Sequence, residues 1–108
     1  MTWTRVHDAW IARECEGWAL IESGDLAGMW KRPDLTVHRC PNYNLDPAAA
    51  IRAAEAWRKK KPGRWWVAQS PIDGLNPSPS AADCWDGRKH WASNDLAESL
   101  IRATGGPA

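Results

Sequence analysis

The sequence contains no phenylalanine and only one tyrosine, whereas it contains nine tryptophans among 108 residues. Without phenylalanine, indoles must supply the large aromatic side chains of the core, and we expect most tryptophans to be buried there. The alternative is that several indoles are exposed, where they stack on bases or anchor an interface with another protein. The composition alone leaves both uses open.

Long apolar runs are absent as well. No segment approaches the roughly 20 apolar residues that cross a bilayer, and the N-terminal stretch MTWTRVHDAW has no basic region followed by an apolar one, as a secretory signal has. The three cysteines, Cys15, Cys40 and Cys84, are an odd number without a C-x-x-C pair, which is typical of reduced thiols. We therefore expect a single domain over residues 1–108 in the cytoplasm, with no membrane partner.

A strong overall charge is also missing, because 14 basic residues stand against 13 acidic ones. Proteins that bind nucleic acid are usually clearly basic, so the total charge argues against that class. The distribution of charge along the chain favours nucleic-acid binding, since residues 31–64 contain nine cations and three carboxylates between acidic flanks. Whether these cations form one surface depends on the fold.

Three segments have the apolar spacing of helices, at about 4–16, 47–61 and 94–103. The second is the clearest. Asp46 is a suitable N-cap, and Pro47 follows at the first helical position, where its missing N–H does no harm. We expect Ser93 to cap the third helix.

The other apolar segments are short and bounded by turn residues, which is typical of strands. They are residues 18–21, 29–31, 35–38, 64–70 and a hairpin over 83–92. Asp86-Gly87 is expected to form a two-residue turn in that hairpin, and residues 70–82, with three prolines, a long loop. The pattern predicts an α+β fold in which a small antiparallel sheet packs with about three helices.

The stretch AWRKKKPGRWW joins the end of the second helix to a strand. Trp57 shares a helical face with Ile51 and Ala54, so we expect it in the core. Trp65 and Trp66 are neighbours on a strand and must face opposite sides of the sheet. Both can be buried only if helices cover both faces of that sheet.

Four parts of the chain resemble, in order, the small phage proteins of the phage ABA sandwich domain family. They are Gly17-Trp18, the segment PNYNLDPAAAIRAAEAW, the tryptophan-rich strand at 65–67 and the segment over 92–103. The resemblance implies an α/β/α-type sandwich encoded by a phage or prophage and located in the host bacterial cell. It implies no catalytic residues, and it favours burial of both Trp65 and Trp66.

Catalytic and metal-binding signatures are missing from the sequence. His38, Cys40, Cys84 and His90 include the residue types of a zinc site but not its usual spacings, and Cys84 with His90 flanks a tight turn rather than forming an evident nucleophile pair. No phosphate-binding glycine loop or nucleophile elbow occurs. We expect no enzyme activity, no cofactor and no metal.

Binding to a protein is the function that we expect first, because tryptophan and arginine are the residues that anchor interfaces. The hairpin residues Trp30, Lys31 and Arg32, together with the 70–82 loop, are the expected contacts. By analogy with other phage proteins, the partner would be a host protein such as a defence effector complex, which the protein would inhibit as anti-CRISPR proteins do.

Two alternatives remain. In the first, the protein binds nucleic acid, with Arg58, Lys59, Lys61 and Arg64 contacting phosphates and exposed tryptophans contacting bases. In the second, it is a structural protein that forms a homo-oligomer through an exposed strand edge. A steep salt dependence of binding would distinguish the first alternative from both others.

Overall fold

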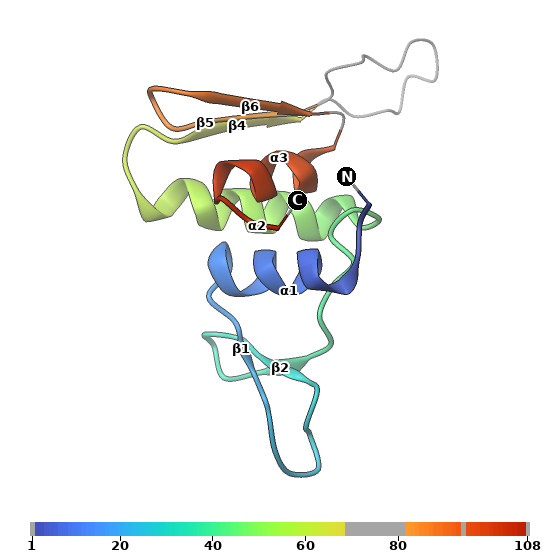
Figure 1. The fold of residues 1–108 in the computed structure, drawn as a ribbon. Coiled ribbons are helices and arrows are strands. Elements are labelled where there is room, and N and C mark those ends of the chain that lie inside the picture. Colours follow the sequence, from blue (N-terminus) through green and yellow to red (C-terminus); the bar gives the residue numbers. More distant parts are fainter. Residues whose placement is uncertain (1, 69–81, 94, 108) are drawn as a thin grey trace.

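The computed structural model describes residues 2–68, 82–93 and 95–107. Helices form the middle of the molecule, and a three-stranded sheet lies on each side of them (Figure 1). The helices are α1 (Arg5–Glu14), α2 (Pro47–Lys60) and α3 (Leu96–Ala103). Figure 1 shows the order of layers as one sheet, then α2 with α3, then α1, then the other sheet.

Both sheets are antiparallel. The first consists of β1 (Ala19–Leu20), β2 (Trp30–Lys31) and β3 (Val37–His38), and the second of β4 (Trp65–Ala68), β5 (Ala82–Trp85) and β6 (His90–Ser93). The predicted α+β class and the three helices are confirmed. The strands differ from the prediction because they form two small sheets instead of one.

The predicted start of α2 is confirmed. The Asp46 carboxylate accepts hydrogen bonds from the backbone N–H groups of Ala48 and Ala49, at 3.1 and 3.3 Å, which satisfies two donors of the first turn. Trp57 is buried as expected, whereas Ile51 is exposed. The buried face of α2 is formed mainly by small residues, and this allows α1 and α3 to approach it closely.

The third helix begins two residues later than the sequence suggested. Asp95 is its N-cap, and the Asp95 carboxylate accepts from the Ala97 N–H at 3.1 Å. Ser93 belongs to β6 instead, so the prediction that Ser93 caps this helix is wrong. A carboxylate and a hydroxyl can both cap a helix, and strand pairing of Ser93 with Ala82 decides between them.

The core lies between the helices and extends to both sheets. It contains Trp18 just before β1, Trp30 of β2, Trp57 from α2, and Leu100 and Ile101 from α3. These side chains are all buried, and burying each indole removes roughly 150–250 Å² from water. Several tryptophans therefore serve as the large aromatic side chains of the core, which is the first of the two uses that the composition left open.

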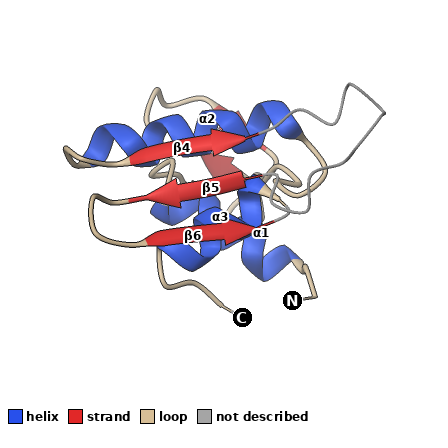
Figure 2. Cartoon of the chain, turned by 90° about the horizontal axis from the view of Figure 1, so that it is seen from above, coloured by secondary structure: helices blue, strands red, loops and turns tan. Residues whose placement is uncertain are grey.

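Helices cover only one face of the β4–β5–β6 sheet, as the view from above shows (Figure 2). Trp66 points to the covered side and is half-buried, while Trp65 points away and is 61% exposed. The expectation that both indoles are buried beneath helices on both faces is therefore wrong. Alternation along β4 places the two neighbours on opposite faces, and only one of these faces is covered.

None of the described helices is long and apolar enough to cross a membrane. The longest, α2, carries three basic residues in its last turn.

Candidate nucleic-acid interface on the open sheet face

The uncovered face of the second sheet carries aromatic side chains in a row across its strands. Trp65 of β4 pairs with Trp85 of β5, and Trp85 pairs with His90 of β6. Facing residues on neighbouring strands are about 5 Å apart. The next row on the same face consists of Val67, Asp83 and Ala92. We call these six residues the open sheet face.

The open sheet face is apolar and accessible. Trp65 is 61% exposed, Val67 60% and Trp85 37%. Exposed apolar side chains that adjoin one another on neighbouring strands are typical of interaction sites. Flat rings at three adjacent positions are the arrangement on which bases of a single strand stack.

His90 is held in place on this face by two contacts. Its ring stacks on Trp85 with centroids 5.5 Å apart and an interplanar angle of 12°. Its Nδ1 lies 2.7 Å from Oδ2 of Asp83 on the facing strand. These contacts fix the imidazole against the indole, so the two rings form one stacked pair on this face.

Two turns meet at the end of the sheet where the aromatic row lies. One follows α2 and contains Lys61 and Gly63, and the other joins β5 to β6. A Cβ added to Gly63 would lie 3.7 Å from the Asp86 carbonyl oxygen, and one added to Gly87 would lie 3.7 Å from the Gly63 carbonyl oxygen. Both glycines have positive φ, at 85° and 95°, which L side chains adopt only with strain. The two turns therefore fit closely against each other.

This contact gathers cations that are far apart in the sequence. Lys61 comes from the first turn, while Arg88 and Lys89 come from the second, and all three are exposed. Among the described residues, Lys61 and Arg88 form no side-chain hydrogen bond or ion pair, and the Lys89 ammonium lies 5.7 Å from the Trp91 ring centroid. We call these three residues the turn cations.

Asp86 is the carboxylate nearest to the turn cations in sequence, and its role is structural. Its Oδ1 accepts from the backbone N–H groups of Lys89 and Arg88, at 2.9 and 2.8 Å. These bonds lower the pKa of Asp86 below its ordinary value and close a four-residue turn. The predicted two-residue turn at Asp86-Gly87 is therefore wrong.

The length of this turn determines the aromatic row. With four residues between the strands, Trp85 pairs with His90 and both face away from the helices. A two-residue turn would have placed Trp85 opposite Arg88. Sequence analysis missed Trp85, His90, Arg88 and Lys89 as binding residues because the register of the hairpin was not known. The alternation of side chains between the two faces of β5 was the signal in the sequence that could have identified Trp85.

The predicted phosphate-binding residues at the end of α2 and just after it divide into two groups. Lys59 and Lys61 are exposed, as expected. Arg58 is bound to the Glu55 carboxylate at 2.9 Å, and Arg64 donates to the Trp57 carbonyl oxygen at 2.9 Å while it stacks on the Trp57 ring. These two arginines therefore stabilise the junction of α2 and β4, which leaves Lys59 and Lys61 as the cations of that stretch without a partner among the described residues.

The predicted contacts in the first sheet lie on the other side of the helices (Figure 1). Trp30 is only 5% exposed, with the Arg13 guanidinium 5.7 Å from its ring, so it is a core residue and not an exposed interface anchor. Arg32 is half-buried and lies 5.4 Å from the Trp18 ring. Lys31 alone of this group is exposed. The seven predicted residues therefore do not form one site.

Two other predictions concern loops and metals. The 70–82 loop lies outside the described residues except for Ala82, which begins β5.

Cys84 faces the helices, whereas His90 lies on the open sheet face, so these two side chains cannot converge on a zinc ion or act as a catalytic pair. Within the described parts of the chain, no three residues of the types His, Cys, Asp and Glu are grouped as metal ligands.

A comparison with known protein families, curated proteins and solved structures finds no match to this chain. The resemblance to the phage ABA sandwich domain family therefore stays a prediction, as do the host-protein partner and the inhibition of a defence system. The functional argument rests on the site itself.

Proposed function

We propose that the protein binds single-stranded nucleic acid on the open sheet face. The observation that carries the proposal is the aromatic row of Trp65, Trp85 and His90, which ends beside the turn cations. Bases would stack on the rings, and phosphates would lie against Lys61 and Arg88. Stacking on aromatic side chains contributes about 1–3 kcal/mol per base and tolerates any sequence.

The choice between nucleic acid and protein as the partner rests on charge. An exposed aromatic face also fits a protein interface, but such interfaces are depleted in lysine. Here the exposed Lys61 and Arg88 lie in the two turns at the end of the aromatic row, while the two carboxylates nearby are engaged, Asp86 by backbone N–H groups and Asp83 by His90. A single strand suits this face better than a duplex, because duplex bases are stacked on each other and do not present their faces.

Binding is tested with a short labelled oligothymidylate by fluorescence anisotropy across a salt series. We expect Trp85→Ala to weaken binding by roughly 5- to 100-fold, which corresponds to the loss of one stacked base. Lys61→Ala and Arg88→Ala are expected to reduce the slope of log affinity against log salt by about 0.7 each. Lys31→Ala, an exposed cation on the opposite sheet, is the matched control and should leave both quantities unchanged.

The proposal fails if the wild-type protein does not bind the oligonucleotide at low salt. It also fails if Trp85→Ala and Lys31→Ala bind equally well, or if a duplex of the same length binds more tightly than the single strand. Circular dichroism and urea unfolding of each variant confirm that a loss of binding does not reflect a loss of fold.

A further inference from the structure

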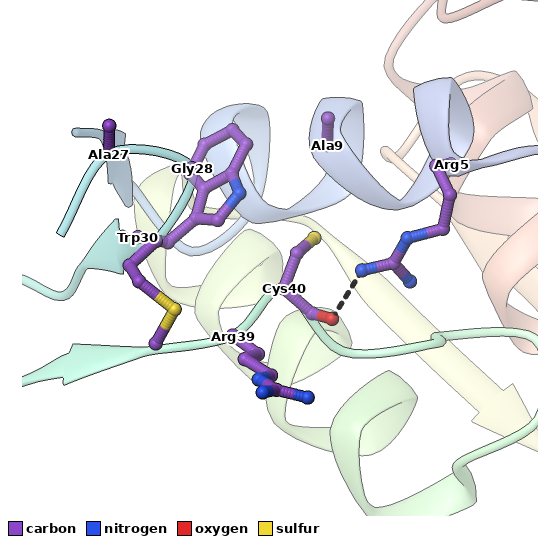
Figure 3. A pocket seen from close by; sticks show the side chains of 8 residues that line it. Arg5, Ala9, Ala27, Gly28, Trp30, Arg39 and Cys40 are labelled. Carbon is purple, nitrogen blue, oxygen red and sulfur yellow. Dashed lines mark hydrogen bonds between the residues drawn. The ribbon is translucent and has the colours of Figure 1, made fainter. Parts of the chain in front are cut away.

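A pocket of about 450 Å³ lies between α1 and the first sheet, on the other side of the helices from the open sheet face (Figure 3). This volume is in the range of small-molecule sites. Eight residues from three segments line it: Arg5 and Ala9 of α1, Ala27, Gly28, Met29 and Trp30 around the start of β2, and Arg39 and Cys40 after β3.

Small residues create the space. Ala9 and Ala27 have short side chains, and a Cβ added to Gly28 would have no heavy atom within 4 Å. Met29 and the largely buried Trp30 provide apolar surface beside this space. A ligand that fills the pocket must therefore have a compact apolar body.

The polar groups of the pocket are guanidinium groups. Arg5 is held rigidly, because it donates to the Cys40 carbonyl oxygen at 2.6 Å (Figure 3), to Asn42 Oδ1 at 2.5 Å and to Asp8 Oδ2 at 2.9 Å. Its Nε–H and one Nη2–H have no partner among the described residues. Arg39 is exposed and likewise forms no ion pair in the described part of the chain.

Among the described residues no carboxylate lines the pocket, so the charge of Arg39 is not balanced there. Asp8, which does not line the pocket, forms an ion pair with Arg5. Its two oxygens accept hydrogen bonds from Trp3, Arg5 and the Tyr43 backbone N–H. The Cys40 thiol is the remaining ionisable group, and burial raises its pKa to about 11, so it is neutral at neutral pH. The pocket is consequently apolar on one side and cationic on the other.

We propose that this pocket binds a small organic anion, with a flat apolar body beside Trp30 and Met29 and a carboxylate or sulfonate group facing Arg5 and Arg39. The pocket is independent of the open sheet face, since the helices separate the two. Guanidinium groups suit such ligands because their planar donors match the oxygens of a carboxylate.

The test is a titration of the full chain with 2-naphthoate, followed by ¹H–¹⁵N NMR of backbone amides and arginine Nε–H groups. We expect saturable shifts concentrated at Gly28, Cys40 and Arg39. The neutral analogue 2-naphthamide should bind at least about fivefold more weakly, since it lacks the ion pair.

Two variants probe the apolar and the charged side separately. Ala27→Phe should fill the pocket and abolish the shifts, and Arg39→Gln should weaken binding about fivefold. Arg88→Gln is the matched control: it removes one of the turn cations beside the open sheet face and should weaken oligonucleotide binding but not naphthoate binding. Arg39→Gln should do the reverse, so failure at one site is distinguished from failure at the other.

The proposal is overturned if the shifts do not saturate, if they scatter over the surface, or if 2-naphthamide binds as well as 2-naphthoate. Unchanged binding by both Ala27→Phe and Arg39→Gln would also overturn it.

Discussion

The Trp66 indole N–H donates a 2.7 Å hydrogen bond to Oε1 of Glu55, and this bond joins β4 to α2. Arg58 binds the same carboxylate through two nitrogens, at 3.1 and 2.9 Å. Glu55 therefore fixes the side of the sheet on which Trp66 lies. Because neighbours on a strand alternate, the same bond holds Trp65 on the open sheet face.

Acid should weaken this junction. The hydrogen bonds from Arg58 and then Trp66 lower the pKa of Glu55 from 4.5 to about 2. A depressed pKa in the folded state contributes stability that is present above about 4.5 and is lost as the pH falls toward about 2. We expect Glu55→Gln to reduce the free energy of unfolding at neutral pH and to flatten its decline over that range.

Urea unfolding at a series of pH values measures this effect. Glu98→Gln is the control, because Glu98 also forms an ion pair with an arginine, Arg102, but on α3 and away from β4. If the free energy of unfolding declines with pH in parallel for wild type, Glu55→Gln and Glu98→Gln, Glu55 has no special part in acid stability.

Tryptophans at the two ends of the AWRKKKPGRWW stretch should differ sharply in their effect on stability. Trp57 is 2% exposed, so Trp57→Ala is expected to cost about 3–5 kcal/mol. Trp65→Ala is expected to change the free energy of unfolding by less than about 1 kcal/mol, because its indole is largely in water. Urea unfolding of both variants decides this, and comparable losses would show that Trp65 is not an exposed side chain.

Asp8 should be essential for attaching the 41–43 segment to α1. Its carboxylate is 1% exposed and accepts from the Trp3 indole at 3.0 Å and from the Tyr43 backbone N–H at 2.9 Å. Asp8→Ala leaves these buried donors unpaired, at a cost of about 1–3 kcal/mol each. Thermal unfolding measures the loss, and Asp34→Ala, which removes an exposed carboxylate, should have little effect. Equal effects of the two substitutions would contradict the assignment.

The three cysteines should react at different rates with iodoacetamide. Burial raises the pKa of Cys15 to about 12, and that of Cys40 and Cys84 to about 11, so all three are thiols at neutral pH. Cys40 is partly exposed, whereas the other two are buried. Mass spectrometry of the labelled native protein should show Cys40 modified first and the others only after urea is added. Early labelling of Cys15 or Cys84 would contradict their burial.

The local features of the fold were determined by the sequence. Asp46-Pro47 located the start of α2, and the apolar spacing correctly placed Ala54 and Trp57 in the core, although not Ile51. These features depend on residues within one or two turns of each other, which is the range over which capping and helical periodicity act. The three-helix α+β class followed from the same local patterns.

Only the tertiary structure decided which face of β4 is covered and how β5 pairs with β6. The geometry of a strand specifies that Trp65 and Trp66 point to opposite faces of the sheet, but the helices that cover one of these faces come from elsewhere in the chain. Likewise, the four-residue turn after Trp85 sets a register that brings His90 and the turn cations beside Trp65. The candidate site consists of contacts between distant segments, and no periodicity within a single segment encodes such contacts.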